Sequence, residues 1–271
     1  MTLGGAGHSR ALAESLSKKG TFIGLDMDAD AIARAQDALA DVAPTIHLVK
    51  ANFRDLAAQL PKLGIEKVDK VLFDLGWSSY QLDAGRGFSL NSEEPLLMTY
   101  GKESDPKGLT AATIVNEWAE SSIADVIFGW GEERYSRRIA KQIVERRASK
   151  PFVTANDLAE TIYSAVPSNY RFGRIHPATR TFQALRIAVN DELGALSQGL
   201  QAAWQALRPG GRIAVISFHS IEDRIVKQTF AQWEKEGAGK RLTKKPVTAG
   251  EEELAKNPRS RSAKLRVAEK L

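Results

Sequence analysis

Short apolar runs alternate with helical patterns in the first part of the chain, as they do in βαβ units. Three runs predict strands: Thr21–Leu25, Ile46–Val49 and Val68–Phe73. Asp26 and Asp74 directly follow the first and third runs, and Phe53 stands a few residues after the second. Because the carboxyl ends of parallel strands meet at one edge of a sheet, where ligands bind, we expect these three side chains to lie close together.

The strand pattern stops near residue 87 and helical patterns take over. Tyr135, Ile139 and Ile143 form one apolar stripe at helical spacing, and Thr154 followed by Asp157 is typical of a helix N-terminus. After about residue 177 a long helical pattern leads into a further strand. The sequence therefore predicts an α/β fold: a doubly wound core of residues 1–87 and 178–271, with an inserted helical domain over residues 88–177.

The composition excludes several classes of protein. The chain has 271 residues, no cysteine and no apolar run of about 20 residues, which excludes disulfides, thiolate metal sites and an integral membrane protein. The four histidines contain no pair at i, i+4 spacing, so we expect no metal site. Because no leader peptide is recognisable, the expected location is the cytoplasm.

Positive charge is concentrated in two segments. Lys and Arg outnumber Asp and Glu by 38 to 33, and residues 134–150 and 257–271 are especially basic. Such segments bind polyanions such as nucleic acids, but each is equally typical of a solvated surface. Charge alone leaves both interpretations open.

A glycine loop, Gly4–His8, precedes a predicted helix, and Asp26 follows it at about the spacing found in nucleotide-binding units. Glycines let the backbone approach a ligand and the acid binds ribose hydroxyls, although a plain turn is the alternative. Arg10 stands where a dinucleotide loop needs its third glycine, which favours a cofactor without phosphates, as in methyltransferases. Phe53 would then lie beside the adenine, unless it is an ordinary core aromatic.

The segment Asp74–Ser79 follows the third predicted strand and has the composition of an amine-binding motif. Amino-methyltransferases place an acid or amide, small residues and an aromatic here, so that oxygens accept the hydrogens of an exocyclic amine. The lone pair of that amine is delocalised into the base, so acceptors are needed to favour a tetrahedral, nucleophilic nitrogen. Asp74 is the predicted catalytic residue; alternatively it caps a turn and Trp77 packs in the core.

Seven stretches, which together span nearly the whole chain, resemble the family of 16S ribosomal RNA cytosine-N4 methyltransferases known as RsmH or MraW. They are Thr2–Ser9, Asp74–Asp83, Arg86–Ser89, Gly131–Arg138, His176–Arg186, Ser217–Arg224 and Asn257–Arg266.

The resemblance implies methylation of the N4 amino group of a cytidine in the decoding region of 16S rRNA, within the 30S subunit. It implies S-adenosylmethionine as the methyl donor and a methyltransferase core interrupted by a helical domain, and it leaves a homodimer open. The cofactor contacts it implies are Gly5, Ala6, Gly7, His8, Asp26, Phe53, Asp74 and Gln81. The candidates for phosphate contacts with the RNA are Arg134, Arg137, Arg138, Arg180, Arg259, Arg261, Lys264 and Arg266.

Three features depart from the family pattern. Family members have a first strand and a few tens of residues ahead of the glycine loop, so we expect a chain shortened at its N-terminus. Glu94–Thr99 lacks an acid and a base of the usual Gly-Pro-Leu-Asp-Met-Arg, and Trp77 replaces a smaller aliphatic residue. Two alternatives stay open: a methyltransferase of this fold that acts on DNA or protein, and a ribosome-assembly factor without catalysis.

Overall fold

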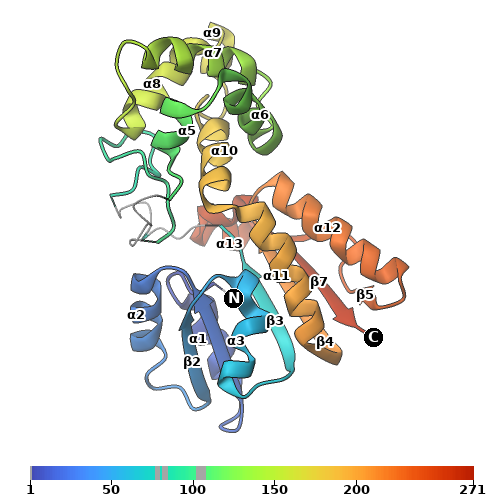
Figure 1. Ribbon diagram of the computed structural model, residues 1–271. Coiled ribbons are helices and arrows are strands. Elements are labelled where there is room, and N and C mark those ends of the chain that lie inside the picture. The colour runs from blue at the N-terminus through green and yellow to red at the C-terminus, as the bar shows by residue number, and fades with distance from the viewer. Residues whose placement is uncertain (1, 77–79, 81–84, 102–107) are drawn as a thin grey trace. The chain divides into compact units, whose positions relative to one another are not determined.

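The computed structural model describes residues 2–76, 80, 85–101 and 108–271, and the chain divides into two compact units. The first unit is Met1–Trp77 with Leu193–Leu271, and the second is Ser78–Glu192. The predicted limits of the inserted domain, residues 88 and 177, fall inside the second unit and stay a prediction. In Figure 1 the strands of the described residues belong to the first unit, and helices dominate the second.

Parallel strand pairs form the centre of the first unit. β1 (Thr21–Asp26) pairs with β2 (Thr45–Lys50), and β3 (Val68–Asp74) pairs with β4 (Leu207–Ser217). Three more strands extend the second of these sheets by antiparallel pairing: β7 (Lys264–Lys270) on β4, then β5 (Gly239–Arg241) and β6 (Val247–Thr248) on β7. The predicted α/β class and the three predicted strands are confirmed.

The two parallel pairs form separate sheets rather than one continuous doubly wound sheet, since within the described residues no strand joins them. Thr2 and Leu3 link their carboxyl ends instead. The Leu3 N–H donates to the Asp26 carboxylate at 2.9 Å, and the Thr2 hydroxyl donates to the carbonyl oxygen of Asp74. Side chains of both sheets nevertheless share one core, in which Leu25 of β1 and Phe73 of β3 are buried.

Helices and short 3-10 turns surround these sheets. Those of the first unit are α1 (Gly7–Glu14), α2 (Ala29–Ala38), η1 (Phe53–Asp55), α3 (Leu56–Gln59), η2 (Pro61–Leu63), α11 (Glu192–Ala206), α12 (Ser220–Lys235), α13 (Glu251–Lys256) and η3 (Pro258–Ser262). The long helical pattern of the sequence is two helices, because Asp191 adopts a left-handed conformation, with φ of 46°, just before α11.

The second unit has its own helical core. Its helices are α5 (Ala111–Glu117), α6 (Glu120–Gly131), α7 (Ser136–Arg147), α8 (Ala155–Ala165), α9 (Ser168–Arg171) and α10 (Thr179–Asn190). Ile139 and Ile143 of the predicted stripe are fully buried in this core, and the Thr154 side chain accepts the Asp157 N–H at 3.2 Å as predicted. A search of the described residues finds no helix with the length and apolarity that a membrane crossing requires.

Close packing holds α11 against the sheets of the first unit. At Gly199, an added Cβ would lie 2.6 Å from the Phe53 ring and 3.2 Å from the Phe73 ring, so only glycine lets the helix approach this closely. Further along α11, Trp204 stacks on Trp233 of α12 with ring centroids 3.9 Å apart. These aromatic contacts fix α11 relative to β3 and α12.

Gly199→Ala should destabilise the first unit by about 1–3 kcal/mol, because the extra methyl group overpacks the aromatic contact. Chemical denaturation followed by near-ultraviolet circular dichroism measures the effect. Gly250→Ala is the control, since a Cβ there would meet no atom within 4 Å and should change stability by less than about 1 kcal/mol. Equal midpoints for Gly199→Ala and the parent protein would contradict this account of the packing.

Candidate active site

The glycine loop makes a tight turn into α1. Gly4 and Ala6 adopt left-handed conformations with φ of 51° and 62°. The Ala6 N–H donates to the Leu3 carbonyl at 2.7 Å, and Gly7 then begins the helix. Because alanine enters this region at a steric cost that glycine avoids, the buried Ala6 is held there by its surroundings.

The Asp26 carboxylate, at the end of β1, organises this turn. Its Oδ2 accepts the N–H groups of Leu3 at 2.9 Å and Gly4 at 3.3 Å, and its Oδ1 accepts that of Asp28 at 2.9 Å. A carboxylate has about four acceptor positions, so Oδ1 can still accept one more hydrogen bond. Asp26 therefore combines a structural role with the capacity to bind a hydroxyl group.

Asp74, at the end of β3, forms an ion pair with His8. The Asp74 Oδ2 lies 3.0 Å from the His8 Nδ1, and the two side chains are 30% and 63% exposed. The hydrogen bond to Asp74 raises the pKa of His8 above its ordinary value of 6.5, against the opposing effect of partial burial. The sequence placed both residues near one edge but did not reveal this pair, because 66 positions separate them.

Phe53 lies in η1, just after β2, and its ring is half-buried. It meets the Phe73 ring edge-on, with centroids 5.4 Å apart and an interplanar angle of 81°. The Asn52 side chain accepts the Arg54 N–H at 3.0 Å and so fixes the start of this turn. Phe53 is thus part of the core on one side, and its predicted contact with adenine stays a prediction.

The structure brings most of the predicted cofactor residues to one edge of the first unit. Hydrogen bonds connect the glycine loop to Asp26, His8 to Asp74, and Thr2 to Asp74. Gln81 and Trp77, which the sequence also singled out, lie outside the described residues.

His219, which follows the carboxyl end of β4, has a structural role that the sequence did not reveal. It caps α12 through a capping box: its Nδ1 accepts the Glu222 N–H at 3.4 Å, and the Glu222 carboxylate accepts the His219 N–H, also at 3.4 Å. Histidine is an unusual residue at the first position of a capping box, where Ser and Thr are usual.

The basic residues predicted to contact RNA differ in their surroundings. Arg134, Arg137 and Arg138 are exposed at the start of α7, and Arg259 and Arg261 are exposed in η3. Arg180 donates to the carbonyl oxygen of Glu132 at 2.9 Å.

Arg266 is different, since it is buried in an ion pair. Its Nε and Nη2 donate to the two carboxylate oxygens of Asp223 at 2.7 and 3.1 Å, and Lys264 lies 3.5 Å from the same carboxylate. Burial raises the pKa of Asp223, but Arg266 and Lys264 outweigh it and lower that pKa below its ordinary value. The structure thus corrects the prediction for Arg266: its guanidinium ties β7 to α12 and is not presented to a phosphate.

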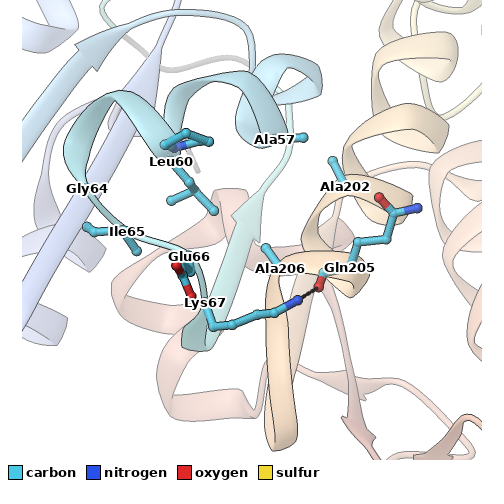
Figure 2. A pocket seen from close by; sticks show the side chains of 10 residues that line it. Ala57, Leu60, Gly64, Ile65, Glu66, Lys67, Ala202, Gln205 and Ala206 are labelled. Carbon is cyan, nitrogen blue, oxygen red and sulfur yellow. Dashed lines mark hydrogen bonds between the residues drawn. The ribbon is translucent and has the colours of Figure 1, made fainter.

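A cavity of about 430 Å³ opens at the other end of β3 (Figure 2). Leu60, Ile65 and Ala206 contribute apolar lining, and the Lys67 ammonium donates to the carbonyl oxygen of Gln205 at 3.0 Å. Residues 64–67 precede β3, whereas Asp74 ends it. The cavity is therefore distinct from the edge that carries Asp26 and Asp74.

Comparison with known proteins decides the family. The family model described as the MraW methylase family matches residues 1–271. The chain belongs to the MraW methylase family. Among curated relatives, the ribosomal RNA small subunit methyltransferase H of Heliobacterium mobile is 49% identical over 100% of this chain and 91% of its own length. The proteins of the same name from Deinococcus radiodurans and Nostoc punctiforme are each 50% identical, over 99% and 100% of this chain and 82% and 86% of their own lengths.

The segment in which this MraW methylase departs from the family pattern has well-defined contacts. The Glu94 carboxylate accepts the Gly87 N–H at 2.9 Å, and Leu96 and Met98 are buried in the core of the second unit. Thr99 donates to the carbonyl oxygen of Gly101 at 3.3 Å. The Glu94 side chain thus ties this segment to the backbone of Gly87.

In this MraW methylase, Asp74→Asn should lower the pKa of His8, because the substitution removes the negative charge that favours the imidazolium form. A pKa raised in the folded state means that the pair stabilises the fold below the ordinary value of 6.5, and that this contribution is lost as pH rises through the raised value. NMR titration of the His8 ring measures the change. His176, whose pKa is lowered by burial, is the control and should titrate identically in both proteins. An unchanged His8 titration would show that the ion pair is absent in solution.

Proposed function

We propose that this chain transfers a methyl group from S-adenosylmethionine to the N4 amino group of a cytidine in the decoding region of 16S rRNA. The observation that carries the proposal is the hydrogen-bonded edge of Asp26, the glycine loop, His8 and Asp74 in a member of the MraW methylase family. The name of the relatives supports the small-subunit rRNA as substrate. The proposal places the protein in the cytoplasm and its substrate in the 30S subunit, and the homodimer stays a prediction.

The glycine loop fits a cofactor without phosphates. The N–H groups of Leu3, Gly4 and Ala6 already donate within the protein, to Asp26 and to the Leu3 carbonyl. A dinucleotide would need such N–H groups to bind its pyrophosphate, whereas S-adenosylmethionine has no phosphate. The remaining acceptor position of Asp26 suits a ribose hydroxyl, which is the contact that the proposal assigns to it.

The residues that would hold the cofactor all come from the loop, the strand ends and the segment after β3. They are Gly5, Ala6, Gly7, His8, Asp26, Phe53, Asp74 and Gln81. When bound, the sulfonium group supplies an activated methyl group, so the protein needs neither a strong base nor a metal for the transfer.

The proposed role of Asp74 is to align the attacking amine. One of its carboxylate oxygens lies beside His8, and the other can accept a hydrogen from the cytosine amino group. Such a hydrogen bond favours a tetrahedral nitrogen whose lone pair faces the methyl group. His8 fixes the orientation of the carboxylate, and Thr2 binds the carbonyl oxygen of the same residue, so this acceptor is preorganised.

The decisive test of the substrate is methyl transfer to 30S subunits from a strain that lacks this methylation. With labelled S-adenosylmethionine, we expect N4-methylcytidine in nucleosides prepared from the 16S rRNA, detected by mass spectrometry. Label in DNA or protein instead would favour a methyltransferase of the same fold with another substrate. Binding to 30S subunits without transfer would favour the non-catalytic assembly factor.

Two variants separate cofactor binding from alignment. Asp26→Ala should weaken S-adenosylmethionine binding by roughly tenfold or more, since it removes the hydrogen bonds that hold the loop. Asp74→Ala, which removes the acceptor oxygens, should lower kcat by roughly 100-fold and weaken cofactor binding less.

Calorimetry gives the affinities of these variants and single-turnover assays give the rates. Asp69→Ala is a matched control, because Asp69 is an exposed aspartate at the other end of β3 and should leave both quantities unchanged. Normal turnover by Asp74→Ala would remove Asp74 from the proposed mechanism.

A further inference from the structure

Phe172 directly follows the short helix α9, which Figure 1 labels in the second unit, and its ring is exposed. The Phe172 side chain is 84% exposed, and residues 173–176 are exposed as well. A single exposed apolar residue is common on protein surfaces and by itself indicates nothing. The residues around Phe172 are what indicate a binding role for it.

The base of this loop is rigidly held. Arg171 donates through Nε to the carbonyl oxygen of Val166 at 3.1 Å and through Nη2 to that of Ser164 at 2.9 Å. The Gly173 N–H donates to the carbonyl oxygen of Tyr170 at 3.3 Å. Because these bonds fix the residues on both sides of Phe172, the ring is presented from an ordered turn, which lowers the entropic cost of binding.

Positive charge surrounds the loop. Arg174 is exposed and makes no hydrogen bond, ion pair or ring contact with the described residues. The Arg134 guanidinium lies 5.0 Å from the centre of the Tyr170 ring, and Tyr170 donates to the buried Glu133 at 2.5 Å. Burial and this hydrogen bond raise the pKa of Tyr170 to about 12, while the charges of Arg180 and Arg134 oppose the rise. Glu133 is buried and bonded to Tyr170, so the charged side chain that the loop itself exposes is the cation Arg174.

Phe128 of α6 is a second exposed phenylalanine in the same unit, but acidic residues lie near it in the sequence. It is 64% exposed, but the exposed Asp125 stands three residues before it on the same face of α6, and the exposed Glu132 directly follows the helix. A polyanion would be repelled at Phe128 and attracted at Phe172.

We propose that Phe172 stacks on an unpaired base of the RNA substrate while Arg174 and Arg134 contact the neighbouring phosphates. Exposed aromatic rings flanked by arginines are how proteins bind unpaired RNA, since every base has a flat face and every nucleotide a phosphate. The inference rests on the proposed rRNA substrate and adds a contact that lies in the second unit, outside the residues assigned to the cofactor and to catalysis.

The test compares Phe172→Ala, Phe172→Trp and Phe128→Ala in the full chain. Fluorescence anisotropy measures binding to a single-stranded oligonucleotide with the sequence of the small-subunit decoding region. Phe172→Ala should weaken binding by about 5- to 140-fold, Phe172→Trp should retain it, and Phe128→Ala should leave it unchanged. Annealing the oligonucleotide to its complement should abolish the effect of Phe172→Ala, because no unpaired base remains.

Salt dependence separates stacking from charge. Arg174→Ala should make the slope of log K against log salt less negative by about 0.7, whereas Phe172→Ala should leave the slope unchanged. Circular dichroism confirms that each variant is folded, and Phe172→Trp guards against a merely structural effect.

Several outcomes would overturn the inference. The first is equal RNA affinity of Phe172→Ala and the parent protein, and the second is an equal loss of affinity in Phe172→Ala and Phe128→Ala. The third is a loss of affinity for intact 30S subunits without a loss of affinity for free RNA, which would indicate a protein partner. The methylation assay keeps this failure distinct from failure of the proposed function: if the parent protein methylates 16S rRNA and Phe172→Ala binds and methylates equally well, only the stacking role is rejected.

Discussion

The Asp26 carboxylate is the interaction on which the candidate site depends. Three backbone N–H groups converge on it: that of Leu3 just ahead of the glycine loop, that of Gly4 at the start of the loop, and that of Asp28 in the turn that leads into α2. Backbone donors in a tight turn must find acceptors, and a carboxylate can satisfy several at once. Without it, Leu3 and Gly4 would lose their partners, and the link between the two sheets would lose one of its hydrogen bonds.

Carboxylates at or near the other strand ends also form several hydrogen bonds within the protein. At β3, Asp74 offers its carbonyl oxygen to Thr2 and its carboxylate to His8. Beyond β4, Glu222 closes the capping box of α12, and the next residue, Asp223, binds the buried Arg266. Charged groups near this edge are therefore mostly bonded to the protein itself, and the positions that stay open define what a ligand can contact.

Local signals in the sequence predicted the parts of this structure that depend on local rules. The apolar runs of β1, β2 and β3 and the cap at Thr154 follow from periodicity and from capping preference, and Asp26 and Asp74 were found because strand ends in parallel sheets collect ligand-binding residues.

Features that depend on the tertiary fold were missed. The pairing of His8 with Asp74 joins two distant segments, and the division into two sheets depends on which strands become neighbours. Arg266 stands in a basic run, which suggests a surface, but β7 turns it toward Asp223 of α12. The sequence of the basic run contains no pattern that predicts the buried ion pair with Asp223.

The stacked indoles of Trp204 and Trp233 give the first unit an optical signature of its own. Two chromophores in such close, nearly parallel contact couple their transitions, and the coupling vanishes when α11 and α12 separate. Trp118 and Trp130 belong to the second unit and are not in this stack. Loss of the coupled tryptophan signal would therefore report the unfolding of the first unit separately from that of the helical second unit. Comparing the two would show whether the units unfold together or in succession.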